Sequence, residues 1–433
     1  MEDCGDAREP PLNSQTSEQF EMKRNIPRRD FLKHGALAAA AALIVPARVS
    51  ASLPRAGESL GFARTAAPRK VVVLGAGLAG LAAGYELTKA GHDVKVLEAQ
   101  ERPGGRVLTL RVFDGSVYAD AGAARIPDNH EWTLRYVKEF GLRLLPFYPE
   151  AGLFVRLKKG RRAEVNWAQF RDAVEDSIGI ELGEGRGWHK IEGGNDLLPR
   201  AFAERLEGKV TYDAPVTRVE QDADGVRVTF KRGGALETLA ADYAVCAIPF
   251  AVLGRVRFAP ALSERKRKVR DEMTYEMAAR AFLQCRGRFW ERGRVNGFAV
   301  SDLPAEFWPS TFGQRADRAV LQAYVRHFTS LQWAKKPEPE RINLALEMTE
   351  QALPGARADF ERGAVKCWGE DEWAGCAWTH PSGPQLVAIN APEGRIHFAG
   401  EHASVYASWM NGALESGNRA ARAVAEAARD AAA

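Results

Sequence analysis

The chain has 433 residues, of which 45% are hydrophobic, so it is long enough for a sizeable core and more than one domain. Its formal net charge of +4 at pH 7 is too small to indicate a nucleic acid or another polyanion as partner. The five cysteines, at positions 4, 246, 285, 367 and 376, have neither metal-binding spacing nor the pattern of a disulfide framework, so we expect no metal site.

The first 69 residues predict a leader rather than part of the fold. Basic residues at 23, 24, 28 and 29 precede an apolar run at 36–45, which is too short to span a bilayer, and a small-residue cleavage site at 49–51. Arg28 and Arg29 begin a segment that resembles the twin-arginine export signal, although Pro27 stands where Ser or Thr is usual. We therefore expect a disordered leader, signal and linker over 1–69, recognition by the twin-arginine export machinery, and a periplasmic or secreted protein. An amphipathic anchor or a disordered basic arm is the alternative.

Residues 71–106 carry the motif around which the chain is organised. The apolar run 71–74 predicts a strand buried on both faces, and Gly75, Gly77 and Gly80 follow it with the G-x-G-x-x-G spacing that opens a helix over about 78–90. A second strand over 94–97 ends at Glu98, at the distance where an acid accepts the hydroxyls of a ribose. The segment predicts a dinucleotide site for FAD or NAD rather than NADP. The alternative is that the glycines only cap a helix.

The rest of the mature chain predicts a mixture of strands and helices. Short apolar runs indicate strands, helical periodicity indicates helices, and Gly, Pro and Asp mark their ends. In chain order we expect a strand pair at 107–113 and 117–119, a helix at 130–140, paired strands at 153–157 and 163–165, a helix at 167–178, a loop at 191–198 leading into a helix that runs to 205, a small antiparallel sheet of 210–212, 216–221 and 226–230, a buried strand at 242–249, strands at 275–285 and 319–326, a helix at 339–351, and a strand at 395–401 before a helix at 410–427.

Three blocks of the chain, 75–106, 191–198 and 398–422, resemble the flavin amine oxidase superfamily, which includes monoamine oxidases, polyamine oxidases and L-amino-acid oxidases. The resemblance runs from about residue 69 to 425. It implies an enzyme that binds FAD and takes hydride from the carbon that bears an amine. FAD is favoured over NAD because both ends of the chain fit one flavin site.

The resemblance also implies an α/β fold, in which a discontinuous Rossmann-like FAD-binding domain is interleaved with an α+β substrate domain. We expect the FAD-binding domain to comprise 70–107, 194–272 and 392–433, and the substrate domain to comprise 108–193 and 273–391. The second strand-glycine-helix unit, at the C-terminus, favours a cofactor domain that is assembled from distant pieces of the chain.

Within the superfamily, the segment 122–130 resembles the L-amino-acid oxidases, whose arginine at the position of Arg125 pairs with the substrate α-carboxylate. A planar guanidinium suits this task because it grips a carboxylate with two hydrogen bonds. Tyr324 resembles the tyrosine whose hydroxyl donates the second contact. A structural arginine and a core tyrosine are the alternatives, and the joint fit of the two residues favours the carboxylate clamp.

Trp409 and Trp378 match the two walls of the family's aromatic cage, which would align the amine near flavin N5 and exclude water. Two core tryptophans are the alternative. Ala377 stands where monoamine oxidases carry the cysteine that is joined to the flavin, so we expect non-covalent FAD. The aromatic lining favours a large or apolar substrate side chain.

The resemblance also implies which residues contact the cofactor, and the chain departs from the family pattern in two ways. Arg280 stands where the family has a lysine that holds a water near N5, and the substrate histidine of larger amino-acid oxidases has no counterpart. Beside Gly75, Gly77 and Gly80, the expected contacts are Leu78, Ala79, Gly105 and Arg106 at the phosphates, Glu98 and Ala99 at the ribose, Val216 at the adenine, Ala123, Ala124, Arg125 and Trp409 at the isoalloxazine, and Gly400, Glu401, Met410 and Ala413 along the ribityl chain and pyrimidine.

The sequence therefore predicts an FAD-dependent L-amino-acid oxidase that yields a 2-oxo acid, ammonia and hydrogen peroxide, with molecular oxygen as the second substrate. Arg125, Tyr324, Arg280, Trp378 and Trp409 are its expected catalytic residues. A monoamine or polyamine oxidase, an amino-acid 2-monooxygenase and a redox-silent flavin scaffold are the alternatives. The protein would act on a small molecule, without nucleic acid, and its alternative states of assembly are a monomer and a homodimer.

Overall fold

The computed structural model describes residues 64–178, 187–302 and 305–431. The predicted signal and most of the linker lie outside the described residues. Within the described residues, no helix combines the length and the apolar composition that a membrane crossing requires. Cys246, Cys285, Cys367 and Cys376 are free, buried thiols, as expected for core positions.

A five-stranded sheet organises both ends of the described chain. Its strands are parallel, and their side chains alternate between two hydrophobic clusters, with Val71 and Val73 on one face and Val72 and Leu74 on the other. Burial on both faces explains why the strands read as continuous apolar runs. The sheet order is β10 (Val210–Thr211), β2 (Asp93–Leu97), β1 (Lys70–Leu74), β14 (Tyr243–Cys246) and β23 (Ile396–Phe398).

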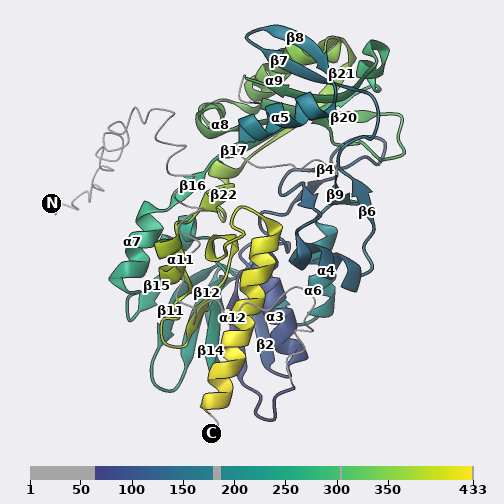
Figure 1. Cartoon of the computed structure of the whole chain (residues 1–433). Helices are drawn as coiled ribbons and strands as arrows, with labels where there is room; N and C mark the ends of the chain where they lie inside the picture. Colours follow the sequence, from purple (N-terminus) through teal and green to yellow (C-terminus); the bar gives the residue numbers. More distant parts are fainter. Residues whose placement is uncertain (1–63, 179–186, 303–304, 432–433) are drawn as a thin grey trace, which may run out of the picture. The chain divides into compact units, whose positions relative to one another are not determined.

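Helices α3 (Leu78–Lys89) and α12 (Met410–Asp430) cover one face of this sheet and lie side by side (Figure 1). Their close approach depends on Gly417, because a Cβ there would lie 2.3 Å from the carbonyl oxygen of Ala79. The other face packs on a four-stranded sheet. That sheet has the order β13 (Ala235–Ala241), β12 (Val226–Arg232), β11 (Val216–Gln221) and β15 (Arg257–Ala259).

A mixed seven-stranded sheet carries the second group of predicted site residues. Its central strands, β17 and β20, are buried along their whole length, so both faces are covered. The order is β21 (Phe360–Cys367), β17 (Ala278–Cys285), β20 (Ala319–Arg326), β19 (Ala305–Pro309), β18 (Val295–Ser301), β7 (Leu153–Lys158) and β8 (Arg161–Val165). Figure 1 shows helices α5 (Trp167–Ile178), α8 (His327–Ala334) and α9 (Glu338–Ala352) around it.

Short elements connect these layers. They are the strand pairs β3 (Thr109–Leu110) with β4 (Ala119–Asp120) and β16 (Thr274–Glu276) with β22 (Trp378–His380), the three strands β5 (Ile126–Pro127), β9 (Trp188–Ile191) and β6 (Leu144–Pro146), the helices α4 (Glu131–Glu139), α6 (Leu197–Arg205), α7 (Glu264–Glu272), α10 (Ala356–Asp359) and α11 (Gly383–Asn390), and the 3-10 turns η2 (Phe250–Arg255), η3 (Phe289–Gly293), η4 (Trp368–Glu370) and η5 (Glu401–Ala403).

Three sequence predictions need correction. The strand at 210–212 is not part of an antiparallel sheet, because β10 pairs in parallel with β2 in the five-stranded sheet. The strand pair over 107–119 is only two residues long on each side. The expected strand at 275–285 is interrupted at Met277, where β16 ends and β17 begins in another sheet. The α/β fold class itself is confirmed, and the residue boundaries of the two domains stay a prediction.

Candidate functional site

A cavity of about 510 Å³ receives the ends of both sheets. Gly75 and Glu98 border it from the five-stranded sheet, and Arg280 and Tyr324 border it from the seven-stranded sheet. Of the predicted cofactor residues, all but Gly80 line it. Segments from both termini of the described chain therefore meet around one elongated space, which is what a dinucleotide with a substrate at one end requires.

The glycine turn after β1 leaves room for a phosphate. Gly75 has φ +100°, a conformation that strains any other residue, and a Cβ added to Gly77 would meet no atom within 4 Å. Gly77 is also the first flanking residue of α3, whose N-terminal N–H groups face this space. A Cβ on Gly80 would lie 1.9 Å from the carbonyl oxygen of Gly75, so this glycine shapes the turn from behind. The turn thus fits the pyrophosphate of FAD.

Glu98 closes the predicted ribose end of the cavity. Its carboxylate accepts hydrogen bonds from the backbone N–H groups of Ala76, at 2.6 Å, and Gln100, at 2.9 Å. Burial nevertheless raises the pKa of Glu98. Each carboxylate oxygen accepts one of these hydrogen bonds and retains a lone pair, so Glu98 can still accept a hydrogen bond from a ribose hydroxyl.

Arg106 and Glu401 form a buried ion pair beside the start of α12. The Arg106 Nη1 lies 2.9 Å from Glu401 Oε1, and the Thr379 hydroxyl donates to the same carboxylate. Burial raises the pKa of Glu401, but the charge of Arg106 together with His402 and the hydrogen bonds from Ser408 and Thr379 outweighs this effect, and the pKa ends below its usual value. Met410 and Ala413 border the cavity nearby. The α12 N-terminus therefore adds partial positive charge at this end.

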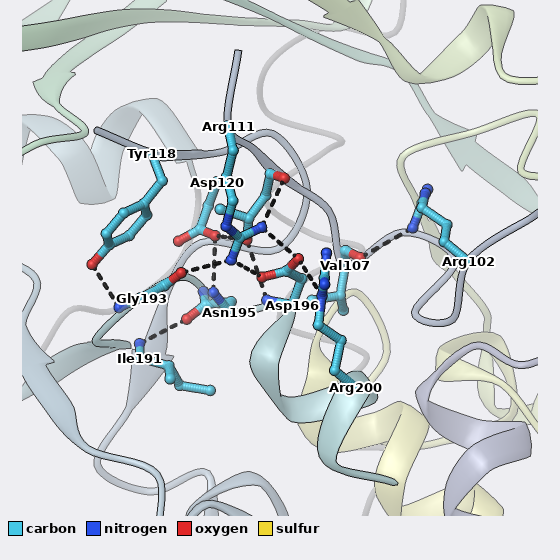
Figure 2. Close-up of polar contacts among 11 residues, drawn as sticks. Arg102, Val107, Arg111, Tyr118, Asp120, Ile191, Gly193, Asn195, Asp196 and Arg200 are labelled. Atoms are coloured by element: carbon cyan, nitrogen blue, oxygen red, sulfur yellow. Dashed lines mark hydrogen bonds and ion pairs between the residues drawn. The ribbon is translucent and has the colours of Figure 1, made fainter. Parts of the chain in front are cut away.

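A polar network holds the segment that carries Arg125. Asn195 donates through its side chain to the carbonyl oxygen of Ala123, at 2.9 Å. Its backbone N–H donates to buried Asp120 (Figure 2). Arg111 contacts both carboxylate oxygens of Asp196, at 2.8 Å each. Burial raises the pKa of Asp120. Residues 191–198, one of the three blocks that resemble the superfamily, thus hold residues 120–125 in position.

Arg125 lies in an aromatic box with one acidic partner. Its Cζ is 4.8 Å from the Trp308 ring centroid and 5.0 Å from that of Phe147. Its Nη2 lies 3.0 Å from Oε2 of Glu306, whose side chain is only 2% exposed. Arg125 Nε and Glu306 Oε1 are both buried without a hydrogen-bond partner. The guanidinium is fixed in place and keeps donor capacity toward the cavity.

Tyr324 lies on the same cavity wall, one strand from Glu306. The register of β19 on β20 pairs Glu306 with Tyr324, and the register of β20 on β17 pairs Tyr324 with Arg280. The Tyr324 ring lies 5.7 Å from Trp308, the same ring on which Arg125 packs. Burial raises the pKa of Tyr324, so its hydroxyl remains a hydrogen-bond donor at neutral pH.

Trp409 and Trp378 both border the cavity. Trp409 packs edge-on against His130, at 4.7 Å, and burial lowers the pKa of that histidine to about 4. Trp378 donates through its indole N–H to His380, at 3.1 Å. Each tryptophan is therefore oriented by an imidazole.

Several cavity residues escaped the sequence prediction. Arg326, His327 and His380 border the cavity, and His327 has the rare φ of +54° for a residue other than glycine. Its Nδ1 lies 2.7 Å from Glu276. Glu306 was missed because β19 is buried throughout and shows no alternation. The only sequence signal for Glu306 was that an acidic residue stands in an apolar run, two residues before Trp308.

The Arg125–Glu306 pair gives a stability prediction. Replacing Glu306 with Ala should lower the free energy of unfolding by about 3–5 kcal/mol, because it leaves a buried guanidinium unpaired. Chemical denaturation of the flavin-loaded protein measures this. Glu272→Ala is the matched control, since it breaks an exposed pair with Lys268 and should cost less than about 1 kcal/mol. Equal, small losses in both variants would contradict the assigned burial.

Comparisons with known proteins give the family of the chain. The family model "Flavin containing amine oxidoreductase" matches residues 78–184 and 169–425. The chain is 29% identical to a putative L-amino-acid oxidase, YobN, from Bacillus subtilis, over 83% of this chain and 95% of that protein. It is 28% identical to the flavin-dependent L-tryptophan oxidase RebO from Lentzea aerocolonigenes, over 82% and 98% of the two chains.

Solved structures resemble the fold. Cyclohexylamine oxidase from Brevibacterium oxydans superposes with a TM-score of 0.73 at 20% identity, covering 84% of this chain and 100% of that one. Putrescine oxidase bound to putrescine gives a TM-score of 0.71 at 20% identity, covering 82% and 99%. At this identity, the likeness concerns the fold alone.

Proposed function

The chain belongs to the flavin-containing amine oxidoreductase family and is an FAD-dependent oxidoreductase of amines or amino acids, and we propose that its substrate is an L-amino acid. The products would be a 2-oxo acid, ammonia and hydrogen peroxide. The observation that supports this most is the joint position of Arg125 and Tyr324, which line one cavity and pack against one tryptophan ring.

FAD supplies the two-electron acceptor for the C–H bond next to the amine. The protein's part is to bind and orient the substrate. Arg125 and Tyr324 hold the carboxylate by charge-assisted hydrogen bonds, and this turns the hydrogen of the α-carbon toward the cofactor. Trp378 and Trp409 wall the amine and exclude water. Ala377 offers no side-chain nucleophile, which supports a non-covalent cofactor.

The second candidate is an amine or polyamine oxidase, and Glu306 is the observation in its favour. A carboxylate 3.0 Å from Arg125 partly neutralises the proposed clamp. We favour the amino acid because Glu306 occupies one edge of the guanidinium, while relatives that match over most of the chain carry the name L-amino-acid oxidase or L-tryptophan oxidase. An amino-acid 2-monooxygenase would instead release carbon dioxide.

A peroxide assay tests the proposal. Purified, flavin-loaded protein is offered each of the twenty L-amino acids, a panel of primary amines, and polyamines, under air. We expect peroxide and ammonia in equal amounts from one or more L-amino acids. Peroxide from amines alone would refute the proposal, and carbon dioxide release would favour the monooxygenase.

Tyr324→Phe tests the hydrogen bond of the carboxylate clamp without changing the shape of the cavity. Loss of one hydrogen bond to a charged group should lower kcat/KM for the amino-acid substrate by about 10- to 100-fold. The phenyl ring keeps the packing against Trp308. Steady-state kinetics with the amino acid and with its decarboxylated amine measure the effect. An equal loss for both compounds would show that the hydroxyl does not contact the carboxylate.

The leader supports export, which we include in the proposal. Twin-arginine export carries folded proteins, which suits an enzyme that acquires FAD in the cytoplasm. Replacing Arg28 and Arg29 with Lys should retain the protein in the cytoplasm, as measured by cell fractionation. Unchanged export would refute this assignment.

A further inference from the structure

One face of the seven-stranded sheet gathers cations around Tyr324. Side chains two residues apart along a strand share a face. The register pairs Arg280 with Tyr324, and Ala278 with Arg326, so both arginines flank the tyrosine on one face. Their Cζ atoms lie 4.6 and 5.6 Å from its ring centroid. The charge of Arg125 also acts on Tyr324, and both residues pack on Trp308.

The nearby acids lie beside the other cations rather than beside Arg280. Glu306 pairs with Arg125, and Glu276 is bonded to His327 and lies close enough to Arg326 to feel its charge. Arg280 is 7% exposed and donates to the backbone oxygen of Asp120, at 2.8 Å. Among the described residues, no carboxylate lies within 4.0 Å of its guanidinium.

An unneutralised buried guanidinium is costly unless a ligand supplies the missing charge. Burial lowers the pKa of Arg280, and the like charge of Arg125 adds to this effect. Even so, an arginine remains protonated in a protein. Because Arg280 borders the substrate end of the cavity, an anion there would relieve both the desolvation and the repulsion.

Arg125 and Arg280 lie within reach of a single small substrate. Their Cζ atoms are 4.8 and 5.5 Å from the Trp308 ring centroid, so they are at most about 10 Å apart. The two carboxyl carbons of extended glutamate are roughly 5 Å apart by ordinary bond lengths. A bidentate guanidinium contact adds about 4 Å at each end, so each arginine reaches one carboxylate when the contacts lie at an angle to the line between the two carboxylates or the substrate side chain is bent.

We propose that the substrate is a dicarboxylic L-amino acid of aspartate or glutamate length, with its α-carboxylate at Arg125 and Tyr324 and its side-chain carboxylate at Arg280. The inference rests on the proposed L-amino-acid oxidase function. A dicarboxylic substrate differs from the one with a large or apolar side chain that the aromatic residues alone favoured. The matched amide, glutamine or asparagine, would offer Arg280 one neutral carbonyl oxygen in place of a charged carboxylate, so it should bind more weakly.

Two unreactive five-carbon acids test the site without turnover. Glutarate carries two carboxylates and valerate carries one, and both are titrated into the flavin-loaded protein while the flavin absorbance is followed. We expect glutarate to bind at least about 10-fold more tightly than valerate, as one added charge-assisted contact implies. Equal affinities would overturn the inference.

Three variants test whether Arg280 causes the preference for glutarate over valerate. Arg280→Met should remove the glutarate preference and leave valerate binding, and Arg280→Lys should restore part of it. Lys366→Met is the matched control, because Lys366 is in register with Arg280 on β21 but is already paired with Asp371, at 2.6 Å. It should keep the preference. A preference that survives Arg280→Met would overturn the assignment, and in that case Arg280 serves the flavin.

Turnover measurements distinguish a failure of this inference from a failure of the proposed function. Anaerobic flavin reduction is compared between L-glutamate and L-glutamine, and between L-aspartate and L-asparagine. Faster reduction by an acid than by its amide supports the inference. Reduction by neutral amino acids but not by the acids overturns the inference and leaves the proposed function standing. Reduction by amines alone overturns the proposed function.

Discussion

Arg125→Met should lower kcat/KM for L-amino acids by about 1,000-fold, because two charge-assisted hydrogen bonds to the α-carboxylate are lost, together worth about 4 kcal/mol. Methionine keeps the apolar stem that packs between Trp308 and Phe147. Activity toward the decarboxylated amine should change far less, since that compound has nothing for the guanidinium to bind. Steady-state kinetics with both substrates measure the ratio.

A second variant must control for Glu306, because Arg125→Met leaves its buried carboxylate unpaired. The double variant Arg125→Met, Glu306→Gln removes both charges and keeps similar volume, so its stability should lie close to that of the parent. Its selectivity should match that of Arg125→Met. If the double variant regained amino-acid turnover, the loss in the single variant would come from misfolding, and Arg125 would not bind the carboxylate.

Gly77→Ala should abolish flavin binding in a protein that still folds. The added Cβ meets no protein atom within 4 Å, and Gly77 has an ordinary φ of −68°. It does fill the space through which the turn approaches the pyrophosphate. We expect the dissociation constant for FAD to rise by about 100-fold or more, as the loss of two hydrogen bonds to a charged group implies.

Gly80→Ala provides the contrast. Its Cβ would lie 1.9 Å from the carbonyl oxygen of Gly75, so the turn between β1 and α3 cannot close. This variant should lose flavin through loss of folding. Circular dichroism of the two apoproteins distinguishes the cases, with native secondary structure for Gly77→Ala and reduced structure for Gly80→Ala. A Gly77→Ala protein that retains bound FAD would contradict the position of the phosphate.

The sequence signals for the cofactor half of the site are local, and all the residues that they name except Gly80 line one cavity. The turn at Gly75–Gly77–Gly80 and the acid at Glu98 follow from spacing within about 25 residues. The expected strand at 395–401 was also right in place, since β23 lies beside β14 in the same sheet. Buried strands and glycine turns carry their own patterns, so both ends of the chain could be assigned before the structure was known.

The substrate half could not be predicted in the same way because its residues meet through non-local pairing. Glu306, Tyr324 and Arg280 become neighbours only through the register of three strands. The β10 segment failed for a related reason, since two residues do not encode which sheet they join. Arg326 and His327 lie where β20 ends and α8 begins, and no residue-type pattern marks them as cavity residues.

Anaerobic flavin reduction by matched pairs is the most direct measurement of whether a carboxylate anchors the substrate. Each L-amino acid is compared with the amine that remains after removal of its α-carboxylate, such as L-glutamate with 4-aminobutyrate and L-phenylalanine with phenethylamine. We predict that an amino acid bleaches the bound flavin and that its partner amine does so much more slowly or not at all. Bleaching by the amines at equal or greater rates would contradict the assignment of Arg125 and Tyr324 as the carboxylate clamp.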